Sequence, residues 1–402
     1  MLVLEYKLVV SAAQSQRIEE ALRTAQFVRN KTLALWYQDR RNKAFDLNKY
    51  CAVLAKEYSF ANALNSQARQ AAAERAAYAV SRYLKTDKSG KRLAKPKFQK
   101  DNRSVEYKVT GWKLSPERKR ITFKDGIGIG TMKMLGTKNP QRDLCAYDLV
   151  LIKRVRILRK ADGYYVQFCI DVDRKETLEP TGSTLGLDMG LAKFYTDSNG
   201  NAVGCPKFLR TAEKKIKRAQ RKHSRKIKGS NNRRKSKSVL GRRHLKVQRQ
   251  RKDFAVKLAR CVVKSSDFVA LEDLQVRNMI KNHCLAKSIA DASWGIFSQW
   301  LLYYGSVFDR PVIKVPPAYT SQECSSCGRR VQKSLSERTH ACQCGCVLDR
   351  DHNAAKNILR LGLALDSKLY PGALENSLGL SEGTLVESEP LLLAYQDSKF
   401  AR

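Results

Sequence analysis

Five of the eleven cysteines in this 402-residue chain fall between positions 324 and 346, and their spacing restricts the local fold more than any other feature. Cys324 and Cys327 form one pair, and Cys342 and Cys344 form a second pair that begins 15 residues after Cys327. Four thiolates held as a tetrahedron suit Zn²⁺, and a closed set of four indicates a structural site. We therefore predict a zinc ribbon over residues 320–348 that holds one zinc ion.

The fourth ligand has two candidates, because Cys346 could replace Cys344. Glycines follow Cys327 and Cys344, and a glycine lets the backbone turn tightly beneath each pair. We prefer Cys344, since a glycine then follows the second ligand of both pairs.

The remaining cysteines are scattered singly, at Cys51, Cys145, Cys169, Cys205, Cys261 and Cys284. An odd total without secretory features argues against a disulfide framework and favours the reducing cytoplasm. The start of the chain has no signal-peptide pattern, and the sequence has no apolar run of about 18 residues or more. We therefore expect a cytoplasmic protein.

The charge balance indicates a polyanionic partner. The chain has 77 Lys and Arg against 38 Asp and Glu, a formal charge of +39 at pH 7. This excess is far larger than solubility requires, and nucleic-acid phosphates are its simplest partner. An anionic membrane would call for an apolar span or a basic amphipathic anchor, and no such span occurs. We expect nucleic acid and no membrane.

The most basic stretch covers residues 211–252, with 19 Lys or Arg and one acid, Glu213. The pattern predicts a helix from about Phe208 that breaks at 229–232 and resumes near Ser238. Few acids are available for salt bridges within these helices, so a phosphate-binding hairpin over 208–262 is favoured over a merely solvated face. The candidate contacts are Lys214, Lys215, Arg233, Arg234, Lys235, Lys237, Arg242 and Arg243.

The first 180 residues predict a small β-barrel that a helical bundle interrupts. Residues 2–10 are apolar and β-prone, whereas residues 14–84 are rich in Ala, Arg, Gln and Leu and contain no proline. A basic loop at 85–103 follows, and then strand-like pieces run to about residue 172, with a hairpin turn at 161–163.

Beyond residue 180 the pattern is typical of an RNase H-like sheet. A strand with the sequence TLGLDMG is followed by AKFYTD, by a tight turn at 198–200 and by a third short strand. SDFVALEDL at 266–274 and PVIKV at 311–315 read as further strands. Residues 287–304 predict an apolar-faced helix, and another helix begins at Asp351.

Three acids stand where this sheet could bring them together. Asp188 and Glu272 each end an apolar strand, and Asp351 opens a helix. Convergent carboxylates repel one another unless cations neutralise them, and two Mg²⁺ ions about 4 Å apart could activate water against a phosphodiester. We predict that Asp188, Glu272 and Asp351 are catalytic magnesium ligands.

Asp349 competes with Asp351 for the third place. Positions 351, 355 and 358 share one helical face, and Ala355 and Ile358 would carry Asp351 toward the sheet. Asp349 is interpreted as a cap or turn residue. No functional role is assigned to Asp197, Asp273 or the five histidines.

The motifs GLDMGLAKF, ALEDLQVRNM, TSQECSSCG and CGCVLDRDHNAAKNI resemble those of the TnpB proteins of bacterial insertion sequences, relatives of type V CRISPR effectors. The resemblance implies that a guide RNA directs cleavage of double-stranded DNA beside a short adjacent motif. It also implies a RuvC-type nuclease domain that carries Asp188, Glu272 and Asp351 and cuts both strands in turn. The short second cysteine pair departs from the family pattern.

The resemblance implies an α/β multidomain chain. A wedge-like barrel would cover 1–12 and 101–180, a helical recognition domain 13–100 and a RuvC-like domain 181–362, followed by an acidic, flexible tail over 363–402. We expect a bacterial protein, associated with the nucleoid when bound to DNA and acting as a monomer with its RNA. A compact type V CRISPR effector and a nuclease-dead RNA-guided repressor are alternatives. A cut-and-paste transposase would order its acids Asp, Asp, Glu, whereas the order here is Asp, Glu, Asp.

Overall fold

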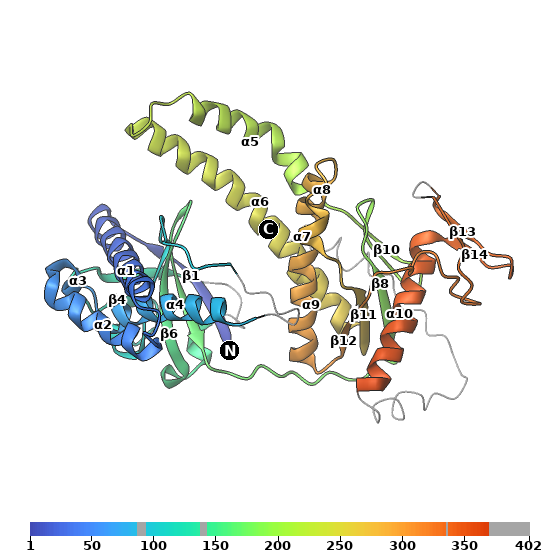
Figure 1. Ribbon diagram of the computed structural model, residues 1–402, viewed down its shortest axis with the longest axis horizontal. Helices are drawn as coiled ribbons and strands as arrows, with labels where there is room; N and C mark the ends of the chain where they lie inside the picture. Colours follow the sequence, from blue (N-terminus) through green and yellow to red (C-terminus); the bar gives the residue numbers. More distant parts are fainter. Residues whose placement is uncertain (87–93, 137–142, 335–336, 370–402) are drawn as a thin grey trace. The chain divides into compact units, whose positions relative to one another are not determined.

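The computed structural model describes residues 1–86, 94–136, 143–334 and 337–369. The chain divides into two compact units, Met1–Arg174 and Lys175–Arg402, and each contains helices and strands (Figure 1). The expected mixed α/β class is therefore confirmed. Part of the predicted basic loop, 87–93, and most of the predicted acidic tail, 370–402, lie outside the described residues. None of the described helices is long and apolar enough to cross a membrane.

The first unit is built on an antiparallel sheet with the order β2-β6-β7-β1-β5-β4-β3. Its strands are β1 (Leu2–Val9), β2 (Ser104–Tyr107), β3 (Trp112–Leu114), β4 (Arg120–Phe123), β5 (Gly130–Leu135), β6 (Ile152–Lys160) and β7 (Gly163–Ile170). The predicted turn at 161–163 joins β6 to β7. Within the described residues, the end strands β2 and β3 do not pair, so the predicted small barrel is an open half-barrel. At one edge β3 has only three residues, and at the other edge the helix over Ser66–Leu84 packs against β2.

The helices of the first unit lie between β1 and β2 in the sequence. They are α1 (Ala12–Gln38), α2 (Ala44–Glu57), α3 (Ser59–Ala63) and α4 (Ser66–Leu84). A capping box at Ser11 and Gln14 begins α1, and the Asn65 side chain caps α4. Ile18, Leu22 and Val28 of α1 are buried with the sheet residues in one core.

The second unit is built on a sheet with the order β10-β9-β8-β11-β12. Its strands are β8 (Thr184–Asp188), β9 (Lys193–Asp197), β10 (Ala202–Gly204), β11 (Phe268–Glu272) and β12 (Val312–Val315). The hairpin β8–β9–β10 is antiparallel, whereas β8, β11 and β12 run parallel. Every predicted strand of this region is present, because each is a short apolar run bounded by a turn or charge signal.

Helices cover both faces of this sheet. They are α5 (Phe208–Ser224), α6 (Asn231–Lys264), α7 (Val276–Met279), α8 (Ala286–Ala292), α9 (Trp294–Phe308) and α10 (Arg350–Leu369). Val269 and Leu271 of β11 face a core shared with α6 and α9, whereas Phe268 and Ala270 face α10 (Figure 1). The alternation follows from the two-residue period of a strand.

Two predicted helix boundaries were wrong. The second basic helix begins at Asn231 rather than near Ser238, because Ser230 caps it by accepting a hydrogen bond from Arg233 N. The single helix predicted over 287–304 is divided into α8 and α9 at Ser293, whose φ is 61°. A left-handed residue ends an α-helix, and apolar periodicity does not reveal it.

Candidate active site and metal centre

Three acids come together at one edge of the second sheet. Asp188 is the last residue of β8 and Glu272 the last of β11. These strands are parallel neighbours, with Leu187 opposite Leu271, so their final residues reach the same edge. Asp351 lies in the first turn of α10, which packs against both strands.

Burial and the neighbouring acids both affect Asp188. The pKa of Asp188 is well above its usual value, chiefly because the side chain is buried and also because Glu272 and Asp351 are negative. Burial also raises the pKa of Glu272. A buried carboxylate beside two further acids is the kind of donor that a hard divalent cation stabilises. The three acids therefore fit magnesium by their chemistry.

Cationic side chains lie beside the acidic cluster. Arg350 Nε lies 3.6 Å and Arg338 Nη1 3.9 Å from Asp351 Oδ1. The positive charge of Arg350 partly offsets the effect of the neighbouring acids on Asp188. Within the described residues, only the four cysteines bring three or more possible ligand atoms within 4.8 Å of one another, so the carboxylates are neighbours that do not reach ligand spacing.

Asp349 caps the helix that carries Asp351. Its Oδ1 accepts hydrogen bonds from the backbone N–H groups of Asp351, at 2.9 Å, and His352, at 3.3 Å. Although burial acts in the opposite direction, these bonds and Lys193 lower the pKa of Asp349. The side chain is thus occupied by the helix N-terminus.

The other two acids near strand ends also have local partners. Asp197 Oδ1 accepts from the backbone N–H groups of Asn199 and Asn201, which holds the turn after β9. Asp273 pairs with Lys314 at 3.2 Å.

Small residues allow α10 to approach the sheet closely. A Cβ atom at Gly186 of β8 would lie 2.1 Å from Ala355 O, and one at Gly362 would lie 2.4 Å from Ala270 Cβ. Ala355 and Ile358 are fully buried, as the helical spacing predicted. This close packing sets the distance between Asp351 and the strand that carries Asp188.

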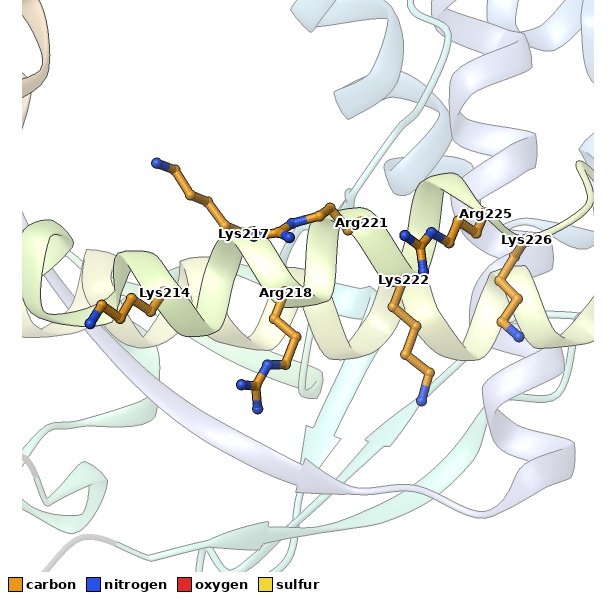
Figure 2. A pocket seen from close by; sticks show the side chains of 7 residues that line it. All are labelled: Lys214, Lys217, Arg218, Arg221, Lys222, Arg225 and Lys226. Carbon is orange, nitrogen blue, oxygen red and sulfur yellow. The ribbon is translucent and has the colours of Figure 1, made fainter.

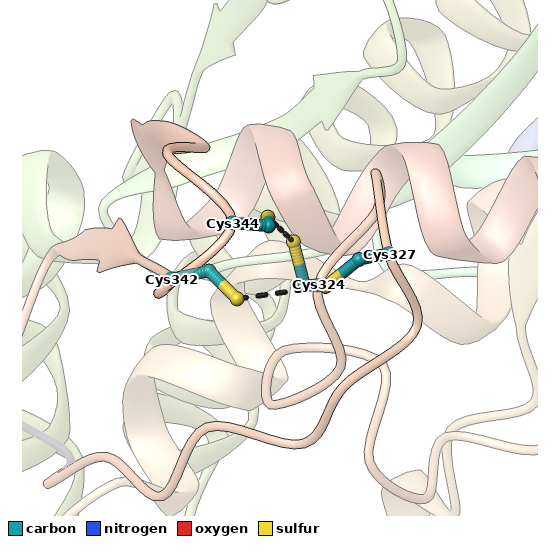
Figure 3. Close-up of side chains that lie close together, drawn as sticks. All are labelled: Cys324, Cys327, Cys342 and Cys344. Carbon is teal, nitrogen blue, oxygen red and sulfur yellow. Dashed lines mark hydrogen bonds between the residues drawn. The ribbon is translucent and has the colours of Figure 1, made fainter.

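Four of the five clustered cysteines meet in space (Figure 3). The Sγ atoms of Cys324, Cys327, Cys342 and Cys344 all lie within 4.8 Å of one another, and the cluster does not include Cys346. Cys324 Sγ lies 3.6 Å from Cys344 Sγ, and Cys327 Sγ lies 3.6 Å from Cys342 Sγ. Four sulfur donors in this arrangement could hold a metal such as zinc.

The local backbone supports the cysteine cluster. Gly328 and Gly345 have φ values of 74° and 86°, the left-handed region that the predicted tight turns require. Although burial acts to raise it, the backbone N–H groups of Cys327 and Ser326 lower the pKa of Cys324 to about 5. This thiol is therefore ready to serve as a thiolate ligand.

Basic side chains line a groove on α5, called here the α5 groove (Figure 2). Its seven lining residues are Lys214, Lys217, Arg218, Arg221, Lys222, Arg225 and Lys226. Lys217 is paired with Glu213 at 2.8 Å, and no acid lines the groove. A cationic groove without acids can hold phosphate groups.

The predicted nucleic-acid contacts differ in their exposure to solvent and in their hydrogen-bond partners. Lys214 lines the α5 groove, and Lys215, Lys235, Lys237 and Arg242 are exposed. Arg234 is exposed but donates to Asn231 Oδ1. Arg233 is half-buried, and its guanidinium donates to Lys226 O at 2.5 Å, which holds the turn between α5 and α6. Arg243 is also half-buried, with a buried Nε.

Sequence reasoning missed Asp291, which holds the base of the hairpin. Its buried carboxylate accepts from the backbone N–H of Leu209, at 2.9 Å, and from both Nε and Nη2 of Arg251. It thus connects α8 to α5 and α6. No local pattern distinguishes this acid in the sequence, because its partners lie 40 and 82 positions away.

Sequence reasoning also missed a threonine and two asparagines beside the acids. Thr320 donates to Glu272, and Asn353 and Asn357 of α10 bind the loop that carries Thr320 and Cys324. Their only sequence signal is their place inside the motifs TSQECSSCG and DHNAAKNI.

Two family models match the second unit for most of their length. The model OrfB_IS605, described as "Probable transposase", matches residues 167–283. The model described as "Cas12f1-like, TNB domain" matches residues 294–358, which include the four clustered cysteines. The three acids and the cysteines thus fall within matched segments.

The chain is similar in sequence to curated proteins that are named as putative RNA-guided DNA endonucleases. The chain is 30% identical to "Putative RNA-guided DNA endonuclease InsQ" of Escherichia coli (strain K12), over 68% of this chain and 70% of that protein. It is 37% identical to "Putative RNA-guided DNA endonuclease" of Streptomyces pristinaespiralis, over 47% of this chain and 48% of that protein. The match thus spans about half the length of the Streptomyces protein. A mimivirus "TnpB-like protein L770" is 27% identical over 64% of this chain and 52% of that protein.

One solved structure shares the fold over most of the chain. The "Cryo-EM structure of the Cas12f1-sgRNA-target DNA complex" matches with a TM-score of 0.52 and 14% identity, over 86% of this chain and 82% of that chain. At this identity the likeness shows the fold alone.

Proposed function

Because the chain belongs to the TnpB family, we propose that it is the RNA-guided DNA endonuclease of a transposable element. It would cut double-stranded DNA beside a short adjacent motif, with one acidic site that cuts both strands in turn. The observation that carries the proposal is the meeting of Asp188, Glu272 and Asp351 at one edge of the second sheet. The names of the InsQ and Streptomyces relatives support it.

In this proposal the second unit is an RNase H-like, RuvC-type nuclease domain. An antiparallel hairpin followed by parallel strands, with helices on both faces, supports this assignment. Residues 1–12 and 101–180 would be the wedge and residues 13–100 the recognition domain.

The acids would hold two Mg²⁺ ions, which would supply an activated water and stabilise the leaving oxygen of the phosphodiester. Asp188 and Glu272 supply ligands from strand ends, where the sheet limits their movement. Asp351 supplies a third from a helix that Gly186 and Gly362 bring close to the sheet. Cys324, Cys327, Cys342 and Cys344 would hold one structural Zn²⁺.

Guide RNA and target DNA would be the partners. Base pairing between guide and target would read the sequence, while the protein would contact phosphates and heteroduplex shape. The α5 groove is suited to the phosphate contacts because its lining carries only positive charges. A cut-and-paste transposase is less well supported, because the acids occur in the order Asp, Glu, Asp.

Alanine substitution of each acid tests the function. Asp188→Ala, Glu272→Ala and Asp351→Ala should each abolish guide-dependent DNA cleavage in Mg²⁺, since two-metal geometry tolerates little displacement. Binding of guide RNA and target DNA, measured by gel shift, should survive. Asp349→Ala is the matched control and should be milder, because Asp349 caps α10 and pairs with Lys193. If all three variants still cut, the proposed function is wrong. If Asp349→Ala is the variant that stops cutting, the third ligand is wrong.

A further inference from the structure

We infer that Thr320 and Asn357 are positioning residues that fix the Glu272 carboxylate relative to Asp351, so that both acids can hold the same metal ions. This inference rests on the proposed function, since it concerns the same site. The geometry points to a chain of buried hydrogen bonds that runs from Glu272 to the helix carrying Asp351.

The first link joins Thr320 to Glu272. Thr320 Oγ1 donates to Glu272 Oε1 at 2.7 Å, and the two residues are only 4% and 7% exposed. The same hydroxyl lies 3.4 Å from Pro317 O, which is a poorer acceptor at that distance. A hydroxyl has one proton, and the short bond to a carboxylate is the stronger of the two. Thr320 therefore fixes one oxygen of Glu272 and leaves Oε2 for other partners.

The residue before Thr320 has an unusual backbone conformation. Tyr319 has a φ of 66°, a strained value for a residue with a large side chain. Its carbonyl accepts from Gln322 N and Glu323 N, at 2.9 and 3.0 Å. The Arg330 guanidinium lies 3.4 Å from the Tyr319 ring centroid, which holds the ring in place. These contacts together stabilise the strained conformation of this turn.

The second link joins the loop to α10. Asn357 is fully buried, and its Nδ2 donates to Thr320 O at 2.9 Å and to Glu323 O at 2.7 Å. Asn357 lies on the same helix as Asp351. The helix that carries Asp351 therefore also holds Thr320, the hydrogen-bond partner of Glu272.

Asn353 attaches the cysteine cluster to the same helix. Its Nδ2 donates to Glu323 O at 2.7 Å, and its Oδ1 accepts from Ser325 N at 2.9 Å. The carbonyl of Glu323, one residue before Cys324, therefore accepts hydrogen bonds from both asparagines. Hydrogen bonds thus join the first cysteine pair and the Thr320 loop to α10.

Such outer contacts matter because buried carboxylates of like charge would otherwise move apart. Groups that hydrogen-bond a metal ligand fix its orientation, and their loss typically costs roughly 10- to 100-fold in metal affinity or activity. A role in folding alone would instead lower stability and leave the metal affinity of the folded protein unchanged.

The test compares Thr320→Val, which keeps the shape and removes the hydroxyl, with Thr320→Ser, which keeps the hydroxyl. Thr32→Val is the matched control, because Thr32 is also buried but bonds only Val28 O within α1. Each variant is loaded with guide RNA. Mn²⁺ affinity is measured by calorimetry, with Asp188→Ala as the baseline, and the Mg²⁺ dependence of single-turnover cleavage is measured in parallel.

We expect Thr320→Val to weaken Mn²⁺ binding roughly 10- to 100-fold and to raise the Mg²⁺ requirement similarly, with guide and target binding unchanged. Thr320→Ser and Thr32→Val should stay close to the wild type. Asn357→Asp, which removes both N–H donors, should behave like Thr320→Val. Equal Mn²⁺ affinity in Thr320→Val and the wild type would overturn the inference, as would equal impairment of Thr320→Ser and Thr320→Val. A wild type that binds Mn²⁺ at the acids but does not cut DNA would instead count against the proposed function.

Discussion

At the scale of single residues, two aspartates with the same side chain have different roles because they occupy different positions at the start of α10. Asp349 and Asp351 are two positions apart, yet Asp349 accepts from the first N–H groups of α10, whereas Asp351 has the larger effect of the two on the pKa of Asp188. The helical period explains the difference, since only position 351 shares a face with Ala355 and Ile358. Chemical type alone would not have separated them.

The two candidates for the fourth zinc ligand give a direct prediction. Cys344→Ser should lose most of its zinc, whereas Cys346→Ser should keep about one ion per chain, because only Cys344 lies in the sulfur cluster. Structural zinc contributes roughly 10–16 kcal/mol of apparent binding free energy in small sites, so its loss should also lower the melting temperature. Elemental analysis of both variants measures this. Zinc lost from Cys346→Ser and retained in Cys344→Ser would identify the other cysteine as the ligand.

Glu106 should make the first unit sensitive to acid. Its buried carboxylate accepts from Arg154 at 2.8 Å and Arg156 at 2.6 Å, with Arg75 at 3.5 Å. Although burial acts to raise it, these arginines lower the pKa of Glu106. Because the pKa of Glu106 is lower in the folded than in the unfolded protein, its charged form stabilises the fold at pH values above the unfolded pKa. This stabilisation is lost as the pH falls through the folded pKa.

Glu106→Gln should therefore reduce the stability of the first unit at pH 7 by about 1–3 kcal/mol. The difference from the wild type should shrink in progressively more acidic buffers, because the wild-type carboxylate becomes neutral there. Thermal unfolding across a pH series measures both effects. Glu117→Gln, at an exposed position, is the control and should change neither. A difference that stays constant with pH would contradict the assigned ion pairs.

At the scale of elements, α10 organises the second unit. It packs on β8, β11 and β12, carries Asp351 in its first turn and binds the Thr320 loop through two asparagines. Its inward face uses Ala354, Ala355 and Ile358, and Gly362 meets Ala270. Small residues on both surfaces let the helix lie close to the strands, so steric fit positions the catalytic candidates.

Gly186→Ala tests this steric fit. A Cβ there would lie 2.1 Å from Ala355 O and 2.7 Å from Leu359 N, so backbone has to move. Overpacking of this kind costs about 1–3 kcal/mol and should displace Asp351, lowering cleavage more than guide binding. Gly204→Ala is the control, because an added Cβ there meets nothing within 4 Å. If the two variants had equal melting temperatures and cleavage rates, the close contact between Gly186 and α10 would not set the position of Asp351.

The α5 groove gives a prediction about salt. Replacing Arg218, Arg221, Lys222 and Arg225 with Gln removes four groove charges. Each lost phosphate contact should reduce the slope of log affinity against log salt by about 0.7–0.9. RNA titrations at several salt concentrations measure this slope. The control replaces four scattered exposed lysines, Lys49, Lys56, Lys113 and Lys119, which removes the same charge. If both sets flatten the slope equally, net charge rather than the groove determines binding.

At the scale of the whole molecule, the chain combines two compact units with a formal charge of +39. The first unit ends at Arg174, before the expected boundary at 180. The following segment belongs to the second unit: Glu176 N donates to Val307 O, and Leu178 packs against the core of α6 and α9. An excess of like charge opposes the compact state because like charges repel, and a bound polyanion would relieve this repulsion.

Several properties could be predicted from the sequence alone because each is local. Cysteine spacing predicted the cluster of Cys324, Cys327, Cys342 and Cys344. Apolar runs predicted that Asp188 and Glu272 end strands, and charge predicted the basic helices. The family resemblance is confirmed by the matched models and relatives. Turn and charge signals at the ends of short apolar runs also predicted every strand of the second sheet.

Only the tertiary structure decided the rest. The roles of Thr320, Asn357 and Asp291 depend on partners that are 34 to 82 positions away, which no local pattern encodes. The inward direction of Arg233 and the open edge of the first sheet likewise follow from packing between elements. Local sequence fixes which face of an element is apolar, but the contacts made between faces are set only when the elements pack.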